Sequence, residues 1–230
     1  MISSYEVKVY ANRQALSKKG KIASFVLEAF NAKKKDEDFL VQFIDHDKTH
    51  YIENMTYRIR KSEDEDIYQL QFKKRYPVTA SVDEAVSQAE QDGFKDGSFE
   101  IEYGAGRQTL SVYYEAEVSA KDHVLPDLAT SHLHLKEQVH DAFKTYLNTI
   151  TAPSIIGPIE FERHIGRLDD YKIKLEKWDI KDKHIIELSA KVLTEQEARK
   201  LQQLLIEKLQ SLHVYEPEDQ LKTTMIFNHY

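Results

Sequence analysis

The sequence contains no cysteine, and only seven glycines and five prolines occur among its 230 residues. Without cysteine, a disulfide framework and a thiolate zinc site are both excluded, which favours a reducing compartment. The opening residues MISSYEVKVY also lack the basic and then apolar pattern of a signal peptide, so we expect a cytoplasmic protein. Because glycine and proline are scarce, we see no flexible linker and expect a single domain over residues 1–230.

Long apolar runs are missing as well. No segment approaches the roughly 18 apolar residues that a membrane-spanning helix needs, so we expect no membrane partner. Hydrophobic residues make up 41% of the chain and charged residues 31%, a balance that excludes a disordered protein. The formal net charge of -7 argues against binding of long nucleic acids, which depends on neutralising phosphates with lysine and arginine. A site for an anion must therefore be a local cluster of cations.

Common catalytic signatures are absent too. The sequence has no G-x-S-x-G elbow of a serine hydrolase and no glycine-rich phosphate loop. The ten histidines suggest a metal site, but His132 and His134 would not face each other on a helix, and His46 and His50 lie in a polar loop. Local motifs therefore identify no catalytic residue.

Alternation of polar and apolar residues predicts about ten β-strands. They are Tyr5–Tyr10, Phe39–Asp45, Met55–Lys61, Tyr68–Arg75, Phe99–Tyr103, Gln108–Val118, Ile159–Ile165, Tyr171–Trp178, His184–Val192 and Lys222–Phe227. These strands follow one another in runs, without the regular intervening helix that parallel pairing requires, so we expect antiparallel pairing.

Helices are predicted at four places between these strands, which makes the fold class α+β. The clearest begins at a capping box formed by Thr194 and Glu197 and continues with an apolar stripe. The four predicted helices are Arg13–Lys34, Ala85–Gln91, Leu133–Leu147 and Thr194–Leu212.

One face of the predicted strands is charged, since side chains two residues apart in a strand project from the same face. The pairs that share a face are Glu6 with Lys8, Arg58 with Arg60, Gln71 with Lys73, Glu115 with Glu117, Lys174 with Glu176, and Glu187 with Ser189. The opposite faces are mainly apolar and would pack beneath the helices. For any single strand, the simplest interpretation is an ordinary sheet whose polar face is wetted by water.

Taken together, about 8–10 strands are enough to close into a barrel, and closure with the apolar face under the helices would place the charges inside. Buried charges are tolerated where they pair, bind a metal or await a ligand of opposite charge. Clustered arginine and lysine suit phosphate oxygens, and interleaved glutamates suit Mg²⁺ or Mn²⁺. We therefore expect a closed antiparallel β-barrel, a charged tunnel with flanking helices.

Several of these segments resemble, in order, strands of the CYTH, or triphosphate tunnel, family. The segments are SYEVKVY, MTYRIRK, YQLQFKK, YKIKLEKW, HIIELSAKV and QLKTTMIF. The resemblance covers nearly the whole chain and suggests a divergent member. That family includes class IV adenylate cyclases, thiamine triphosphatases and inorganic tripolyphosphatases. The resemblance therefore implies a small triphosphate ligand, which could be tripolyphosphate, thiamine triphosphate or a nucleotide.

The resemblance also implies roles for individual residues. The cations that it assigns to phosphate binding are Lys8, Arg58, Arg60, Lys73, Arg163 and Lys222, with Arg167 as an alternative to Arg163. The acids that it assigns to Mg²⁺ or Mn²⁺ are Glu6, Glu176 and Glu187, with Glu115 or Glu117 as a mid-chain acid. Its strongest match is the R-x-R strand followed by the strand that carries Lys73.

The sequence departs from the family pattern at Ser4 and Ser189, where the resemblance places glutamates. Serine brings no charge to a hard cation, so a metal site that depends on these positions would be weakened. If the strand register differs from the expected one, Glu100 and Glu102 could form a metal-binding strand instead.

Three functions remain open at this point. The first is a metal-dependent phosphohydrolase in which cations clamp a triphosphate and carboxylates hold the metal that activates water. The second is an anion-binding or scaffolding module that keeps the tunnel but hydrolyses weakly or not at all. The third is a structural sheet domain with a wetted polar face, which would show no saturable anion binding.

Overall fold

A computed structural model describes residues 2–33, 36–120 and 124–230. The strands within these residues are β1 (Ser4–Ala11), β2 (Glu37–Asp45), β3 (Met55–Ser62), β4 (Ile67–Pro77), β5 (Ser98–Tyr103), β6 (Gln108–Ser119), β7 (Ser154–Leu168), β8 (Tyr171–Ile180), β9 (Lys183–Val192) and β10 (Tyr215–Glu216). The helices are η1 (Arg13–Ala15), α1 (Ser24–Ala29), α2 (Thr49–Ile52), α3 (Val82–Gln91), α4 (Leu128–Gln138), α5 (Asp141–Leu147), α6 (Glu195–Ser211) and α7 (Lys222–His229).

The strands form one sheet in the order β10-β1-β5-β6-β4-β3-β2-β7-β8-β9, and β1 also pairs with β9. Nine strands therefore close into a hydrogen-bonded ring, with the short β10 paired to β1 outside it. The fold is α+β with a closed β-sheet, as the sequence predicts.

The expectation of purely antiparallel pairing is wrong at one pair of strands. β1 and β5 run parallel, with Glu6 opposite Glu102. Parallel neighbours need a long crossover connection, and the chain between these strands passes through β2, β3 and β4 before it returns. The sheet is therefore mixed.

The chain divides into two compact units. Unit 1 consists of Met1–Asp38, Glu100–Gln108 and Glu160–Lys222, and unit 2 of Phe39–Phe99, Thr109–Ile159 and Thr223–Tyr230.

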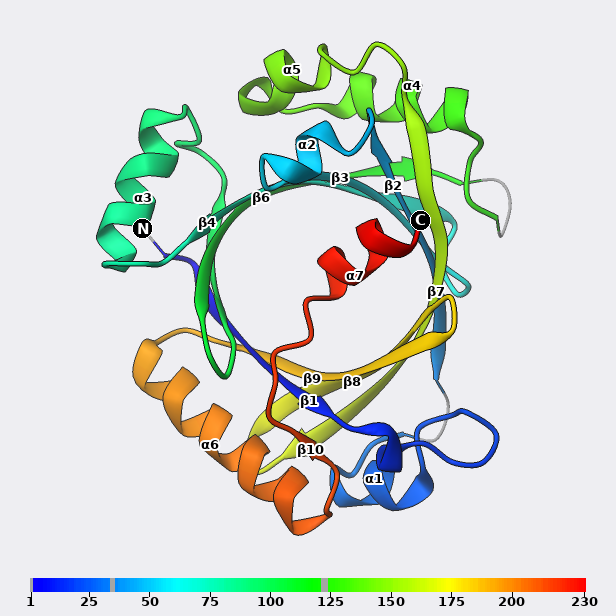
Figure 1. The fold of residues 1–230 in the computed structure, drawn as a ribbon, viewed down its shortest axis with the longest axis vertical. Helices are drawn as coiled ribbons and strands as arrows, with labels where there is room; N and C mark the ends of the chain where they lie inside the picture. Colours follow the sequence, from blue (N-terminus) through cyan, green and yellow to red (C-terminus); the bar gives the residue numbers. More distant parts are fainter. Residues whose placement is uncertain (1, 34–35, 121–123) are drawn as a thin grey trace. The chain divides into compact units, whose positions relative to one another are not determined.

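In unit 1, helix α6 packs on β1 and β9, where Figure 1 shows it in orange. The apolar stripe of the helix is buried through Ala198, Leu201, Leu205 and Leu209. Its capping box is present, because the Thr194 side chain accepts from the Glu197 amide and the Glu197 carboxylate accepts from the Thr194 amide. The helix predicted over Thr194–Leu212 is confirmed, with both end residues as its caps.

The helix predicted over Arg13–Lys34 is wrong, with Lys34 outside the described residues. The turn η1 and the short helix α1 stand in its place, separated by a tight loop in which Gly20 has a φ of 74° and Leu16 bridges to Ile22. Only glycine adopts such a φ readily, so this loop interrupts the helical pattern of the sequence.

In unit 2, α4 and α5 replace the single helix predicted over Leu133–Leu147. The break occurs at Val139, whose extended backbone precedes His140, and the His140 side chain caps the amide of Ala142 at the start of α5. Phe143 of α5 packs edge-on against Tyr57 of β3 and near Phe72 of β4. These two aromatic residues lie on the apolar face of their strands, as the sequence predicts.

The strand predicted over Lys222–Phe227 is also wrong, because these residues begin helix α7. Ile226 and Phe227 are both buried, although neighbouring residues of a strand would project to opposite faces. Phe227 stacks on Tyr51 of α2 and packs edge-on against Phe43 of β2, within unit 2.

None of the helices in the described part of the chain is long and apolar enough to cross a membrane.

Candidate functional site

In unit 1, the charged side chains of β1, β7, β8 and β9 gather on one face of the sheet. Arg163, Glu176 and Glu187 are cross-strand neighbours on β7, β8 and β9. Lys8, Ser189 and Lys174 form the next row, on β1, β9 and β8. Directly opposed residues project to the same side of a sheet, so these two rows form one continuous group, which we call the unit 1 charged face.

Glu176 contacts three side chains on this face, those of Arg163, Trp178 and Lys222. Its Oε1 accepts from Arg163 at 2.8 Å, and its Oε2 accepts from the Trp178 indole at 2.9 Å. Burial alone would raise the pKa of Glu176, but the charges of Lys222 and Arg163, with these hydrogen bonds, outweigh burial and lower it to about 2. Glu176 is therefore ionised at neutral pH.

Lys222 joins Glu176 to Glu187. Its Nζ lies 3.1 Å from Glu187 Oε1 and 3.7 Å from Glu176 Oε2, and it also lies over the Trp178 ring at 3.9 Å. Two carboxylates and an aromatic face thus share one ammonium. Lys222 was expected on a strand and acts instead from the first residue of α7.

Lys8 is held between acids of two strands. Its Nζ lies 3.0 Å from Glu6 and 3.4 Å from Glu102 of β5. Burial would lower the pKa of Lys8, but the charges of Glu102 and Glu6 raise it well above its ordinary value. Glu6 is thus paired with Lys8.

The sequence suggests Glu100 and Glu102 as metal ligands only if the strand register differs from the expected one. The structure places both residues beside β1. Ser4 donates to Glu100 at 3.0 Å, and Lys191 lies 2.6 Å from the same carboxylate. A carboxylate from β5 therefore lies beside Ser4, where the family resemblance places a glutamate. The E-x-E spacing was visible in the sequence, but its position depended on the parallel pairing of β1 and β5.

Lys174 belongs to the same face but was left out of the predicted site, although its spacing to Glu176 was a usable signal. Its ammonium forms no ion pair with any residue that the structure describes, unlike Lys8 and Lys222. Burial lowers the pKa of Lys174, and the nearby charge of Arg163 lowers it further. The charges of Glu6 and Glu176 offset these effects only in part, so the charge of Lys174 is not fully compensated.

Arg163 and Arg167, the two alternatives for one predicted phosphate-binding arginine, have different surroundings in the structure. Arg163 lies against Glu176, whereas Arg167 is exposed near the end of β7, opposite Lys172. Arg163 is therefore the arginine that the structure brings into the unit 1 charged face.

Unit 2 carries a second charged face on β3, β4 and β6. One row contains Arg58, Gln71 and Glu115, and the next contains Arg60, Gln69 and Glu117. Gln71 donates to Glu115 at 2.8 Å, and Arg60 donates to Gln69 at 2.9 Å. Glu115 and Glu117 are both exposed, and Glu115 is the one that hydrogen bonds join to the Arg58 row.

Lys73 lies two residues beyond Gln71 on β4, on the same face of the strand. It is buried, and its Nζ lies 5.2 Å from the centre of the Tyr113 ring, its cross-strand neighbour. We call Arg58, Arg60 and Lys73, with the glutamines and glutamates of the same rows, the unit 2 charged face. Phe43 is opposite Arg58 in register, so α7, which packs on Phe43, lies over this same face.

Three of the four histidines considered in the sequence have ordinary partners, whereas the buried Nε2 of His132 has no hydrogen-bond partner among the described residues. His50 is buried and hydrogen bonds with the Tyr57 hydroxyl and the Thr149 hydroxyl. His46 bonds to the segment that contains Thr151 and Ala152. His134 of α4 packs near the Tyr68 ring.

No family model matches the chain, and no curated protein matches its sequence. Its structure is similar to several solved structures. A putative adenylyl cyclase from Hippeastrum, described as revealing a dominant triphosphatase activity, is 11% identical with a TM-score of 0.60, over 97% of this chain and 94% of its own. A putative adenylate cyclase from Bacillus halodurans is 13% identical with a TM-score of 0.60, over 96% of this chain and 97% of its own. A further putative adenylate cyclase, from Vibrio parahaemolyticus, is 12% identical with a TM-score of 0.50, over 98% of each chain.

These similarities extend over nearly the full length of both chains in each pair, while the identities are low. They agree with the closed nine-stranded sheet. The chain therefore has the CYTH-like, triphosphate tunnel fold that the resemblance of its strand motifs predicts.

Proposed function

We propose that this protein binds a small triphosphate-containing ligand and hydrolyses it weakly or not at all. The observation that carries the proposal is Lys174, a partly buried ammonium on the unit 1 charged face that forms no ion pair within the described residues. A phosphate group would supply the missing negative charge. The description of the Hippeastrum protein as a triphosphatase supports the same class of ligand.

The phosphate groups are assigned to Lys8, Arg163, Lys174 and Lys222 on the unit 1 charged face and to Arg58, Arg60 and Lys73 on the unit 2 charged face. Arginine suits phosphate oxygens because its planar fork donates two parallel hydrogen bonds. The triphosphate group is common to tripolyphosphate, thiamine triphosphate and nucleotides, so the proposal covers all three. It treats residues 1–230 as one functional domain in the cytoplasm, without long nucleic acids or membranes as partners.

Mg²⁺ or Mn²⁺ is the metal that the acidic residues would suit, since both ions prefer carboxylate oxygens. Glu176 and Glu187 share the ammonium of Lys222, which shows that a cation is accommodated between them. These residues would hold the metal, which would offset the charge of the phosphate chain. Glu6, the third predicted ligand, is paired with Lys8 instead.

This arrangement is the reason for expecting weak turnover. Each predicted metal ligand on the unit 1 charged face is already paired with a lysine or arginine, and a serine stands at position 189. A metal must therefore compete with built-in cations, whereas a phosphate chain has an unpaired lysine to bind. We therefore expect the protein to bind a phosphate chain more tightly than it binds Mg²⁺ or Mn²⁺.

A thermal shift experiment tests the binding half of the proposal. Tripolyphosphate should raise the melting temperature saturably, because a ligand that binds only the folded state stabilises it by about 2.7 kcal/mol at 100 times Kd. Sulfate at matched ionic strength should do less. Equal effects of the two anions would contradict an ordered triphosphate site and favour the structural sheet domain.

Phosphate release from tripolyphosphate, thiamine triphosphate and ATP, with Mg²⁺ and with Mn²⁺, tests the catalytic half. We expect rates well below the roughly 10 per second that is typical of enzymes. Turnover at several per second or faster would contradict weak hydrolysis and would favour the metal-dependent phosphohydrolase.

A further inference from the structure

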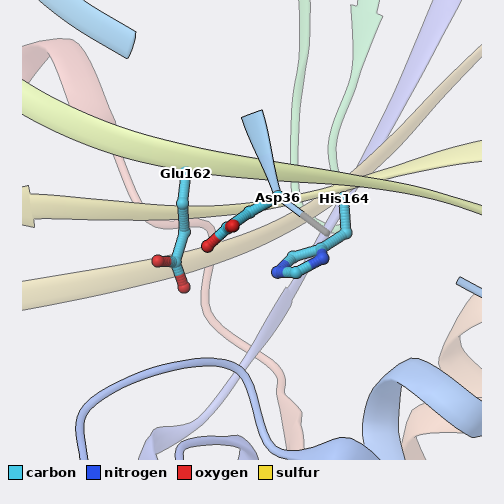
Figure 2. A group of neighbouring side chains, drawn as sticks. All are labelled: Asp36, Glu162 and His164. Atoms are coloured by element: carbon cyan, nitrogen blue, oxygen red, sulfur yellow. The ribbon is translucent and has the colours of Figure 1, made fainter. Parts of the chain in front are cut away.

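Three potential metal ligands meet on unit 1, on the side of β7 opposite to Arg163. Side chains alternate along a strand, so Glu162 and His164 project away from the unit 1 charged face. Both are 3% exposed, and Asp36 joins them from the residue before β2. The ligand atoms of the three residues lie within 4.8 Å of one another, and Figure 2 shows the two carboxylates beside the His164 ring.

His164 has the orientation of a metal ligand. Its Nδ1 lies 2.9 Å from the carbonyl oxygen of Lys33. A carbonyl can only accept a hydrogen bond, so Nδ1 carries a proton, and in the neutral imidazole Nε2 then has the free lone pair. A backbone carbonyl that fixes the ring through one nitrogen is the usual support of a histidine that binds metal through the other.

Glu162 has a buried oxygen that lacks a partner. Its Oε2 accepts a hydrogen bond from Lys21, but its Oε1 has no hydrogen-bond partner among the residues that the structure describes. A buried carboxylate oxygen without a partner is costly. An additional cation in the group would satisfy it.

The negative charge of the group also exceeds the positive charge beside it, which favours binding of a divalent ion. Lys21 contacts both Glu162 and Asp36, the latter at 3.1 Å, and one ammonium cannot neutralise two carboxylates. The Lys21 side chain is 55% exposed, so it can move into water without crossing the protein interior. A divalent cation would neutralise both acids and release the lysine.

We infer that Asp36, Glu162 and His164 form a binding site for a divalent transition-metal ion, with Zn²⁺ as the ion that this set of one nitrogen and two carboxylate ligands suits best. Imidazole favours Zn²⁺ over Mg²⁺, and three protein ligands leave a position for water. The bound ion would tie Asp36 to β7. The site lies on the opposite side of β7 from the unit 1 charged face and does not rest on the proposed function.

Isothermal titration of the metal-stripped protein with Zn²⁺ tests the inference. We expect one tight site per chain for Zn²⁺ and no comparable site for Mg²⁺ under the same conditions. Co²⁺ should bind at the same site and give visible absorption bands that report a nitrogen ligand. A protein that binds neither Zn²⁺ nor Co²⁺ would overturn the inference and leave Lys21 as the permanent partner of the two acids.

Two substitutions assign the site to these residues. His164→Gln should weaken Zn²⁺ binding by tenfold or more and remove the Co²⁺ bands, because even the loss of a supporting group around a metal costs 10–100-fold. Lys21→Met should strengthen Zn²⁺ binding, because it removes the competing cation. Lys19→Met, an exposed lysine of the same loop, serves as the matched control and should leave the affinity unchanged.

Zn²⁺ affinity that is unchanged in His164→Gln would place the ion at another of the ten histidines and overturn the inference. If His164→Gln does not fold, the Zn²⁺ affinities of Lys21→Met and Lys19→Met still test the inference. Weaker or unchanged binding in Lys21→Met would then contradict a site that Lys21 occupies in the absence of metal.

Discussion

At the scale of residues, the unit 1 charged face is defined by which cations have partners. Lys8 and Lys222 are each held by two carboxylates, and Arg163 is held by Glu176, whereas Lys174 has no ion-pair partner among the described residues. The parity of the strands could predict from sequence that Lys174 and Glu176 share a face. It could not predict the pairing, because which lysine meets which glutamate depends on cross-strand register.

Glu176→Gln should change the pH dependence of stability. Because the pKa of Glu176 is lowered to about 2, its stabilising contribution is present above its unfolded pKa of about 4.5 and is lost as the pH falls toward 2. The free energy of unfolding should therefore fall less steeply with pH in the variant, by about 3 kcal/mol over this range. Urea denaturation at pH 5, 4, 3 and 2 measures the difference.

Glu90→Gln, at an exposed glutamate of α3, is the control and should leave the pH profile parallel to that of the natural protein. A parallel profile for Glu176→Gln as well would mean that the contacts of Glu176 with Arg163 and Lys222 contribute little to folding.

Arg58→Ala should weaken tripolyphosphate binding by roughly tenfold or more, since a hydrogen bond to a charged group contributes about 1.5–3 kcal/mol. The melting temperature without ligand should change little, because Arg58 and Arg60 share a face and repel each other. Arg107→Ala, at an exposed turn, is the control. Marked destabilisation of the unliganded Arg58→Ala protein would instead identify Arg58 as a structural residue.

At the scale of elements, α7 shows where the sequence pattern misleads. The run from Lys222 to Phe227 contains two threonines, an isoleucine and a phenylalanine, and residues of these types favour a strand by local criteria. Burial of the neighbouring residues Ile226 and Phe227 stabilises a helix instead. Most other strands were predicted within a few residues of their ends, because their alternation extends over longer runs.

Phe227→Ala should destabilise unit 2 by about 3–5 kcal/mol, since the ring is buried and contacts both Tyr51 and Phe43. Phe25→Ala is the control. Because Phe25 of α1 is 44% exposed, this variant should lose much less free energy of unfolding. Chemical denaturation of both variants measures the difference. Similar small losses would contradict the packing of α7 on β2 and α2.

At the scale of the whole molecule, the sequence predicted the α+β class and a closed sheet, because about ten strands with one charged face favour closure. It could not predict the parallel pair β1–β5, since the pairing partner of a strand depends on contacts between distant parts of the chain. That pair brings Glu100 and Glu102 beside β1, so the position of these two acids could not be predicted without the topology. His164 could have been found from the sequence, because Glu162 and His164 have the spacing of neighbours on one face of a strand. The third ligand, Asp36, is distant in the chain and could not.

We propose that the unit 1 charged face binds a triphosphate through cations that include Lys174. Isothermal titration of tripolyphosphate into Lys174→Met, with Lys172→Met as the control at an exposed lysine of the same strand, tests it most directly. Lys174→Met should weaken binding by roughly tenfold, since a charge-assisted hydrogen bond contributes about 1.5–3 kcal/mol, while Lys172→Met should bind as the natural protein does. Equal affinities for all three proteins would contradict the claim.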